Sequence, residues 1–159
     1  MAGRAEDIRL TAWWQLLAAH ARLVQRVGRD LVAATALPLG SYSVLRLLQE
    51  APGCRLRLGD LARAVLLTRS GVARLVTRLE RAGLLRREGH ARDRRGSYAV
   101  LTDRGQDEWR RASAVFERAV AEQFGSRLSD AEAETLNAVL GRIVTAETGA
   151  DYHEKPVHP

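Results

Sequence analysis

The chain has 159 residues, which is long enough for one domain with a proper hydrophobic core. Its formal net charge is +6, carried almost entirely by arginine, and its single cysteine, Cys54, excludes an intrachain disulfide. The sequence shows no signal peptide and no apolar run long enough to span a bilayer, so we expect a cytoplasmic protein.

The positive charge is concentrated in one third of the chain. Residues 54–104 contain 13 arginines and five acidic residues, so this segment carries about +8 while the remainder sums to about −2. Such an asymmetry favours a polyanionic partner for the basic segment. A solvated basic surface is the other interpretation, and the charge alone does not choose between them.

The first third of the chain predicts two helices. Apolar residues at helical spacing indicate a long helix from Ile8 to about Leu31. The segment 37–40 breaks this helix, and Ser41 is placed to cap a second one. Alanine, proline and glycine at 51–53 end that second helix.

The basic segment begins with a predicted strand and two helices. Arginine and leucine alternate over 55–58, which indicates a short strand, and a short helix follows it. Thr68 is suited to be the N-cap of a second helix over 69–82. Gly83 can take the left-handed conformation that ends this helix.

A hairpin and two further helices complete the predicted elements. The hairpin strands are expected at 84–87 and 97–101, and Thr102 starts a helix that ends at Gly125. The segment 129–132 reads Ser-Asp-Ala-Glu, a capping box that opens the last helix. The apolar stripe of that helix consists of Leu136, Val139, Leu140, Ile143 and Val144.

The helix predicted over 69–81 has two distinct faces when it is drawn at ~100° per residue. The apolar face, which would pack on the preceding helix, consists of Val72, Leu75, Val76 and Leu79. The opposite face consists of Ser70, Arg74, Thr77 and Arg81, with Ala73 and Arg78 beside them. We interpret it as a recognition helix in a major groove, where Arg74 reaches a guanine or a phosphate and Arg78 and Arg81 hold phosphates.

The hairpin is the second basic element. The arginines that flank and fill it are Arg86, Arg87, Arg92, Arg94 and Arg95. An arginine at a hairpin tip can enter a narrow minor groove, and Asp93 would hold a neighbouring guanidinium in place. The candidate DNA-binding residues are Thr68, Arg69, Ser70, Ala73, Arg74, Thr77, Arg78, Arg81, Arg92, Asp93, Arg94 and Arg95.

The segment 93–102 resembles the wing signature of the MarR family, which is an aspartate, any residue, an arginine, a five-residue spacer and Leu-Thr. The residues at those positions are Asp93, Arg95, Leu101 and Thr102. Gly105 fits the usual continuation, and 75–87 resembles the end of the family's recognition helix and its first wing strand. The resemblance extends over most of the chain.

The resemblance implies a homodimeric bacterial transcription regulator, usually a repressor, whose first and last two helices interlock around a two-fold axis. The recognition helix would read the major groove, and Arg95, oriented by Asp93, would enter the minor groove. Arg94 would be a backbone contact or the alternate for that role. Such a dimer would bind a near-palindrome with half-sites ~34 Å apart.

The expected fold class is mainly α (α+β), a winged helix-turn-helix with a three-stranded wing sheet and long terminal dimerisation helices. We expect a dimerisation helix at 1–36, a DNA-binding region at 37–102, further dimerisation helices at 103–148 and a mobile tail at 149–159. The terminal stripes exceed what a small central unit needs, which supports a dimer over a monomeric helical core.

The resemblance also implies release of DNA by a small aromatic or anionic effector, bound between the dimer helices and the DNA-binding lobe. The residues placed where such a pocket could form are Trp13, Trp14, His20, Tyr42 and Arg46. The alternative is core packing for the tryptophans and the tyrosine, and a satisfied or exposed histidine.

Other kinds of site are not indicated by the sequence. Cys54 follows Pro52-Gly53 and is expected to be a small, half-buried residue in a connection rather than a thiol sensor. We expect no metal, no cofactor and no catalytic centre, because the residue spacings of such sites are missing. The alternatives to a sequence-specific regulator are an architectural or non-specific DNA-binding protein without ligand response, and an enzyme or protein-interaction module on the same fold.

Overall fold

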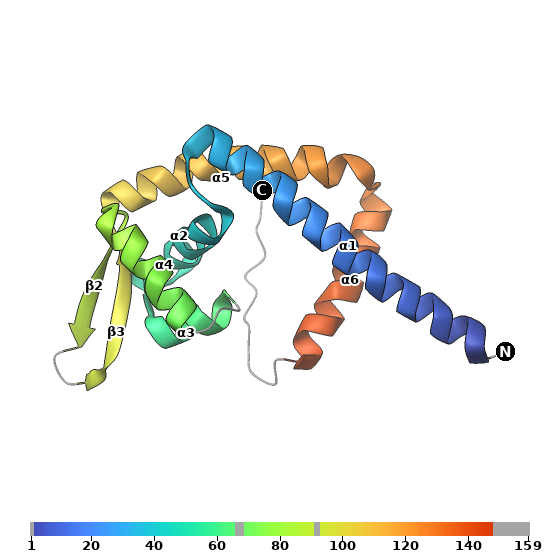
Figure 1. Cartoon of the computed structure of the whole chain (residues 1–159), viewed down its shortest axis with the longest axis horizontal. Coiled ribbons are helices and arrows are strands. Elements are labelled where there is room, and N and C mark those ends of the chain that lie inside the picture. The colour runs from blue at the N-terminus through green and yellow to red at the C-terminus, as the bar shows by residue number, and fades with distance from the viewer. Residues whose placement is uncertain (1, 66–68, 91–92, 148–159) are drawn as a thin grey trace.

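Several helices and a small sheet form a block at one end of the molecule, and long helices extend from this block (Figure 1). The computed structural model describes residues 2–65, 69–90 and 93–147. The elements in chain order are α1 (Ala2–Thr35), α2 (Leu39–Glu50), the 3-10 turn η1 (Pro52–Cys54), β1 (Arg55–Arg57), α3 (Leu58–Ala64), α4 (Arg69–Arg81), β2 (Leu85–His90), β3 (Asp93–Leu101), α5 (Asp103–Gln123), the 3-10 turn η2 (Gly125–Arg127) and α6 (Asp130–Glu147). This order confirms the mainly helical fold class with a three-stranded sheet.

The sheet has the strand order β1-β3-β2, and both neighbouring pairs are antiparallel. Ala99 in β3 lies opposite Leu56 in β1 and Arg87 in β2. Because side chains alternate along a strand, the face that carries Ala99 also carries Leu85 and Leu101, which are buried in the core. The opposite face carries Tyr98 and several arginines.

Helices α2, α3 and α4 pack together over the inner face of the sheet. The predicted apolar face of α4 is confirmed, since Val72, Leu75, Val76 and Leu79 are each at most 7% exposed. Gly83 adopts the left-handed conformation (φ +71°) and ends α4 as expected. The polar face of α4 is thereby fixed on the outside of the block.

Three sequence-based boundaries need correction. Ser41 does not cap α2, because Pro38 occupies the N-cap and the helix begins at Leu39. Proline suits that position, since its missing N–H would lack a partner there in any case. The wing strands are also longer than predicted, because β2 continues to His90 and β3 begins at Asp93, through residues that have little strand propensity of their own.

The long first helix is confirmed, and it packs against α5 with its last turns, where Val27 and Leu31 are buried. Its N-terminal part is uncovered. The exposed large apolar side chains of α1 are Ile8, Leu10, Trp13, Trp14, Leu16, Leu17, Val24 and Val32. In α6, Val139 and Ile143 are 37% and 52% exposed, and this helix packs only slightly against the rest of the described chain.

Within the described ranges, no single helix is long and apolar enough to cross a membrane. Helices α1 and α2 reach the required length and composition only as a pair, and a bend of 81° separates them.

The last helix begins with the predicted capping box. The Ser129 N–H donates to Glu132 Oε2 at 2.9 Å, and the Glu132 N–H donates to Ser129 Oγ at 3.4 Å. The hydrogen bond from the Ser129 backbone holds the pKa of Glu132 below its ordinary value. The capping box therefore defines the turn between α5 and α6.

The start of α5 is tied to the end of the recognition helix. Thr102 Oγ1 accepts from the Gly105 N–H at 3.0 Å, which confirms Thr102 as the N-cap, and donates to the Gly83 carbonyl at 2.7 Å. The Thr102 N–H donates to the Leu84 carbonyl at 3.2 Å. A Cβ at Gly105 would lie 1.9 Å from that carbonyl oxygen, so only glycine permits this approach.

Gly105→Ala is expected to lower the free energy of unfolding by about 3 kcal/mol, because the backbones of α5 and Leu84 must separate. Chemical denaturation followed by circular dichroism measures the change. The matched control is Gly40→Ala in α2, where nothing lies within 4 Å of the new Cβ and stability stays within about 1 kcal/mol of wild type. Equal midpoints for the two variants would contradict the close approach.

Candidate nucleic-acid interface

The polar face of α4 is accessible and strongly basic. Ser70, Ala73, Arg74 and Arg81 are exposed, as predicted from the helical period. An open hollow of about 580 Å³ lies along this face. The residues that line it are Ala73, Arg74, Thr77, Arg78, Arg81 and Arg87. Four guanidinium groups around one hollow form a surface suited to a polyanion.

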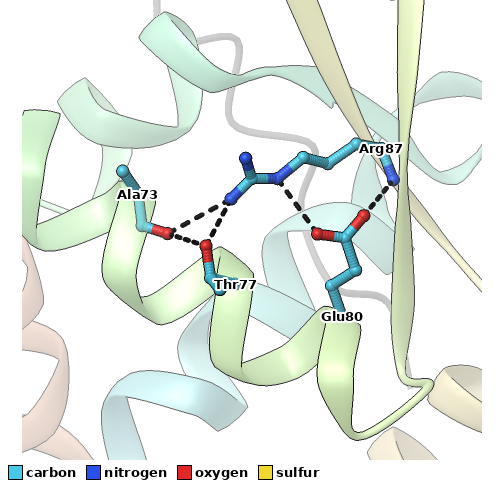
Figure 2. Close-up of polar contacts among 4 residues, drawn as sticks. All are labelled: Ala73, Thr77, Glu80 and Arg87. Atoms are coloured by element: carbon cyan, nitrogen blue, oxygen red, sulfur yellow. Dashed lines mark hydrogen bonds and ion pairs between the residues drawn. The ribbon is translucent and has the colours of Figure 1, made fainter.

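Arg87 enters this hollow from the wing and is held there by α4, as Figure 2 shows. Its Nη2 donates to Thr77 Oγ1 at 2.6 Å and to the Ala73 carbonyl at 3.3 Å. Its Nε forms an ion pair with Glu80 Oε2 at 3.3 Å. The other carboxylate oxygen, Glu80 Oε1, accepts from the Arg87 N–H at 3.2 Å. These contacts fix strand β2 against the recognition helix.

Two of the predicted DNA contacts also have partners within the protein. The Thr77 hydroxyl donates to the Ala73 carbonyl at 2.8 Å while it accepts from Arg87. Arg78 Nη2 donates to the buried Ser41 Oγ at 3.1 Å, which links α4 to the first turn of α2. Both side chains help to orient the recognition helix, a role that the helical period could not reveal.

The outer face of the wing sheet forms a second arginine-rich surface. The guanidinium of Arg55 lies 4.3 Å from the centre of the Tyr98 ring, and Arg57 Nε donates to Tyr98 Oη at 2.9 Å. Glu88 forms ion pairs with Arg55, at 3.8 Å, and with Arg86. The pairing of aromatic, acidic and basic groups across three strands stabilises the sheet that supports the wing.

Several predicted DNA-binding residues lie outside the described ranges or at their borders. Thr68 and Arg92 lie outside the described residues, and only the backbone of Arg69 is described, at the start of α4. The backbone of 93–96 forms the start of β3, and Asp93 pairs with His90 across the hairpin. The roles of Asp93, Arg94 and Arg95 therefore remain predictions.

None of the five candidate effector residues lines the hollow on the α4 face or the second hollow described below. Tyr42 is a core residue: its hydroxyl lies 3.4 Å from Ser113 Oγ, and its ring stacks on Phe116 at 4.6 Å. Burial raises the pKa of Tyr42. Arg46 is exposed and pairs with Glu50 at 3.0 Å.

The other three candidates, Trp13, Trp14 and His20, are exposed on α1. A second hollow, of about 320 Å³, lies elsewhere, between the α1–α2 connection and helices α4 and α5. Its lining includes two arginines, Arg78 and Arg104, and one acid, Glu108. Sequence reasoning missed this hollow, since its walls come from three segments, 35–41, 78–84 and 104–108, that are distant in the sequence.

Cys54 is half-buried in the connection before β1, as expected. Its thiol lies 4.0 Å from the Gln49 carbonyl and 3.9 Å from Gln106 Nε2. Among the described residues, no group of three or more histidine, cysteine, aspartate or glutamate side chains is arranged to hold a metal ion.

Comparison with known proteins identifies DNA-binding relatives, in agreement with a surface suited to a polyanion. The sequence model of the MarR family matches residues 37–96, which span α2 to the start of β3. AbsC, a MarR family transcriptional regulator from Streptomyces coelicolor, is 30% identical, with a TM-score of 0.81 over 91% of this chain and 97% of AbsC. The chain belongs to the MarR family. It is a DNA-binding transcriptional regulator, and not an enzyme.

Two further structures show how relatives function. Sco3205, another MarR family regulator from Streptomyces coelicolor, was solved in complex with DNA; it is 32% identical, with a TM-score of 0.80 over 89% of this chain and 92% of Sco3205. BpsR from Bordetella bronchiseptica, whose DNA binding is regulated by 6-hydroxynicotinic acid, shares the fold at 22% identity, with a TM-score of 0.75 over 84% of this chain and 98% of BpsR.

Proposed function

We propose that this MarR family protein is a repressor that binds a near-palindromic operator as a homodimer. In this proposal, residues 37–102 form the DNA-binding region, and the helices at 1–36 and 103–148 form the dimer. The recognition helix α4 enters the major groove and the wing arginine enters the adjacent minor groove. The observation that carries the proposal is the arginine-lined hollow on the exposed face of α4.

The geometry of α4 supports base reading. Ser70 and Ala73 are small and exposed, so the helix backbone can come close to the base edges. Arg74 is exposed beside them and is suited to bind guanine N7 and O6 with its two terminal amino groups. Arg81, about two turns further from the helix start, is placed to contact phosphates.

The uncovered apolar faces of α1 and α6 support the homodimer. Trp13, Trp14 and Ile143 are each more than half exposed, and α6 packs only slightly against its own chain. Large exposed apolar side chains on helices are typical of an obligate interface. A two-fold assembly through these helices would place two recognition helices on one side of the dimer.

We also propose that a small effector releases the protein from its operator. An anionic or small aromatic molecule in the second hollow would meet Arg78 and Arg104. It would compete with Ser41 for the Arg78 guanidinium and so disturb the link between α2 and the recognition helix. Trp13, Trp14 and His20 would face such a molecule only if the dimer partner completes a pocket around them.

Selection of bound duplexes from a random pool tests the function directly. We expect a near-palindromic consensus with half-site centres about one helical turn apart. Repeating the selection with Arg74→Ala should lower discrimination at one base pair per half-site by about 1–3 kcal/mol. An unenriched pool would leave the architectural alternative, and equal loss on all sequences would reduce Arg74 to a phosphate contact.

Arg95→Ala is expected to weaken operator binding at least tenfold while the protein stays dimeric, because the wing loses its minor-groove contact. Titration of labelled operator at fixed salt measures the affinity, and light scattering measures the mass. Arg94→Ala is the matched control and is expected to have the smaller effect. If the order of the two effects is reversed, Arg94 is the minor-groove residue.

Ile143→Glu is expected to dissociate the dimer, because a carboxylate would be buried in the apolar interface of α6. Analytical ultracentrifugation should show a species near the chain mass of 17.6 kDa, together with loss of operator binding. Asn137→Glu, an exposed polar position on the same helix, serves as the control. A dimeric Ile143→Glu protein would refute the assigned interface.

A further inference from the structure

We propose that Arg87 of the wing strand β2 is a pre-oriented phosphate contact, aimed by Glu80 and Thr77 of the recognition helix. The inference rests on the proposed function, because it requires that α4 and the wing enter neighbouring grooves of one duplex. It adds Arg87 as a DNA contact and Glu80 as a positioning residue. Neither is among the contacts predicted for the recognition helix and the wing tip.

The Arg87 guanidinium has more N–H donors than its protein partners use. An arginine side chain has five N–H donors, of which Nε supplies one and each terminal amino group two. The Nε–Nη2 edge of Arg87 is used by the protein: Nε faces Glu80, and Nη2 serves the Thr77 hydroxyl and the Ala73 carbonyl. Within the described part of the chain, Nη1 makes no hydrogen bond, so two donors remain.

The two remaining donors of Arg87 point away from its protein partners. Figure 2 shows Nη1 directed away from Ala73, Thr77 and Glu80. Arg87 also lines the open hollow on the α4 face, together with Arg74 and Arg81. The side chain is 36% exposed, so part of it remains accessible to a ligand.

In the proposed complex, the junction between α4 and the wing faces a strand of the DNA backbone. The major and minor grooves of a duplex are separated by one sugar-phosphate backbone. If α4 occupies the first groove and the wing the second, that backbone must cross the junction between them. Arg87 bridges this junction, since it starts in β2 and ends on α4. A phosphate is therefore the group that its free amino group meets.

Glu80 has a positioning role in this arrangement. Its carboxylate holds both the Arg87 backbone N–H and Nε, on the guanidinium edge opposite Nη1. Ordering an arginine side chain on binding normally costs free energy. Here the side chain of Arg87 is already ordered in the free protein, so this cost is smaller when DNA binds. The negative charge of Glu80 lowers the non-specific attraction to DNA. It also holds Arg87 in an orientation that suits one position of the protein along the duplex.

The test measures the salt dependence of operator binding. Each phosphate contact to B-DNA contributes about −0.9 to the slope of log affinity against log salt, so two copies in a dimer contribute about −1.8. Arg87→Ala should reduce the slope by that amount and weaken binding. Arg86→Ala is the matched control, since Arg86 is the neighbouring arginine on the opposite sheet face, paired with Glu88, and should leave the slope near wild type.

Two conservative variants separate positioning from charge. Arg87→Lys keeps one positive charge and should retain most of the salt-dependence slope. A lysine cannot hold three protein groups and also bind a phosphate, so operator affinity should fall severalfold. Glu80→Gln removes a negative charge and should raise random-duplex affinity while it lowers the operator-to-random ratio. If this ratio is unchanged or higher, Glu80 does not aim Arg87.

The outcomes distinguish this inference from the proposed function. A wild-type protein that selects no operator contradicts the proposed function. A wild-type protein that binds its operator, with Arg87→Ala and Arg86→Ala giving equal slopes, contradicts the Arg87 contact alone. Circular dichroism of each variant at the assay temperature confirms that the fold is retained.

Discussion

The close approach of two backbones between the recognition helix and α5 is the constraint on which the rest of the structure depends. Gly83 ends α4 in a left-handed turn, and Thr102 and Gly105 bring the start of α5 directly onto that turn. Because α5 also packs on α1, the end of α4 is connected to the long helices through a few backbone atoms. In the proposed dimer, these contacts would join the DNA-binding region to the dimerisation helices.

Arginines in this protein serve two purposes that composition does not separate. Arg74 and Arg81 lie on the exposed face of α4 and are available to a partner. Arg78 and Arg87 instead connect elements, one to Ser41 in α2 and the other to the recognition helix from the wing. A planar group with five donors can bind protein on one edge and leave another edge for phosphate, which an ammonium cannot do with the same rigidity.

Local signals in the sequence predicted much of the fold. The 3.6-residue period placed the buried face of α4, and Gly83, Thr102 and the capping box at Ser129 were readable because their partners lie within a few residues. The family signature pointed to the same region. The exposed arginine face of the recognition helix was predictable for the same reason as its buried face.

Non-local contacts could not be predicted. The hydrogen bonds from Arg87 to Thr77 and from Arg78 to Ser41 depend on the angle between elements, which no local pattern encodes. Ser41 was mistaken for a helix cap because the serine signal competes with Pro38, which begins the helix earlier. Tyr42 was a candidate pocket residue, but its ring is stacked on Phe116 in the core. Position in the sequence alone did not reveal these contacts of Ser41 and Tyr42.

The uncovered faces of α1 and α6 have a consequence for how the protein responds to its own abundance. A chain that buries those faces only against a second copy has a stability that depends on protomer concentration. The DNA-binding species would then rise with the square of the protomer concentration while the protein is dilute. If the proposed homodimer is the DNA-binding form, a twofold change in synthesis would give up to a fourfold change in binding species while the protein is dilute, before any effector is present.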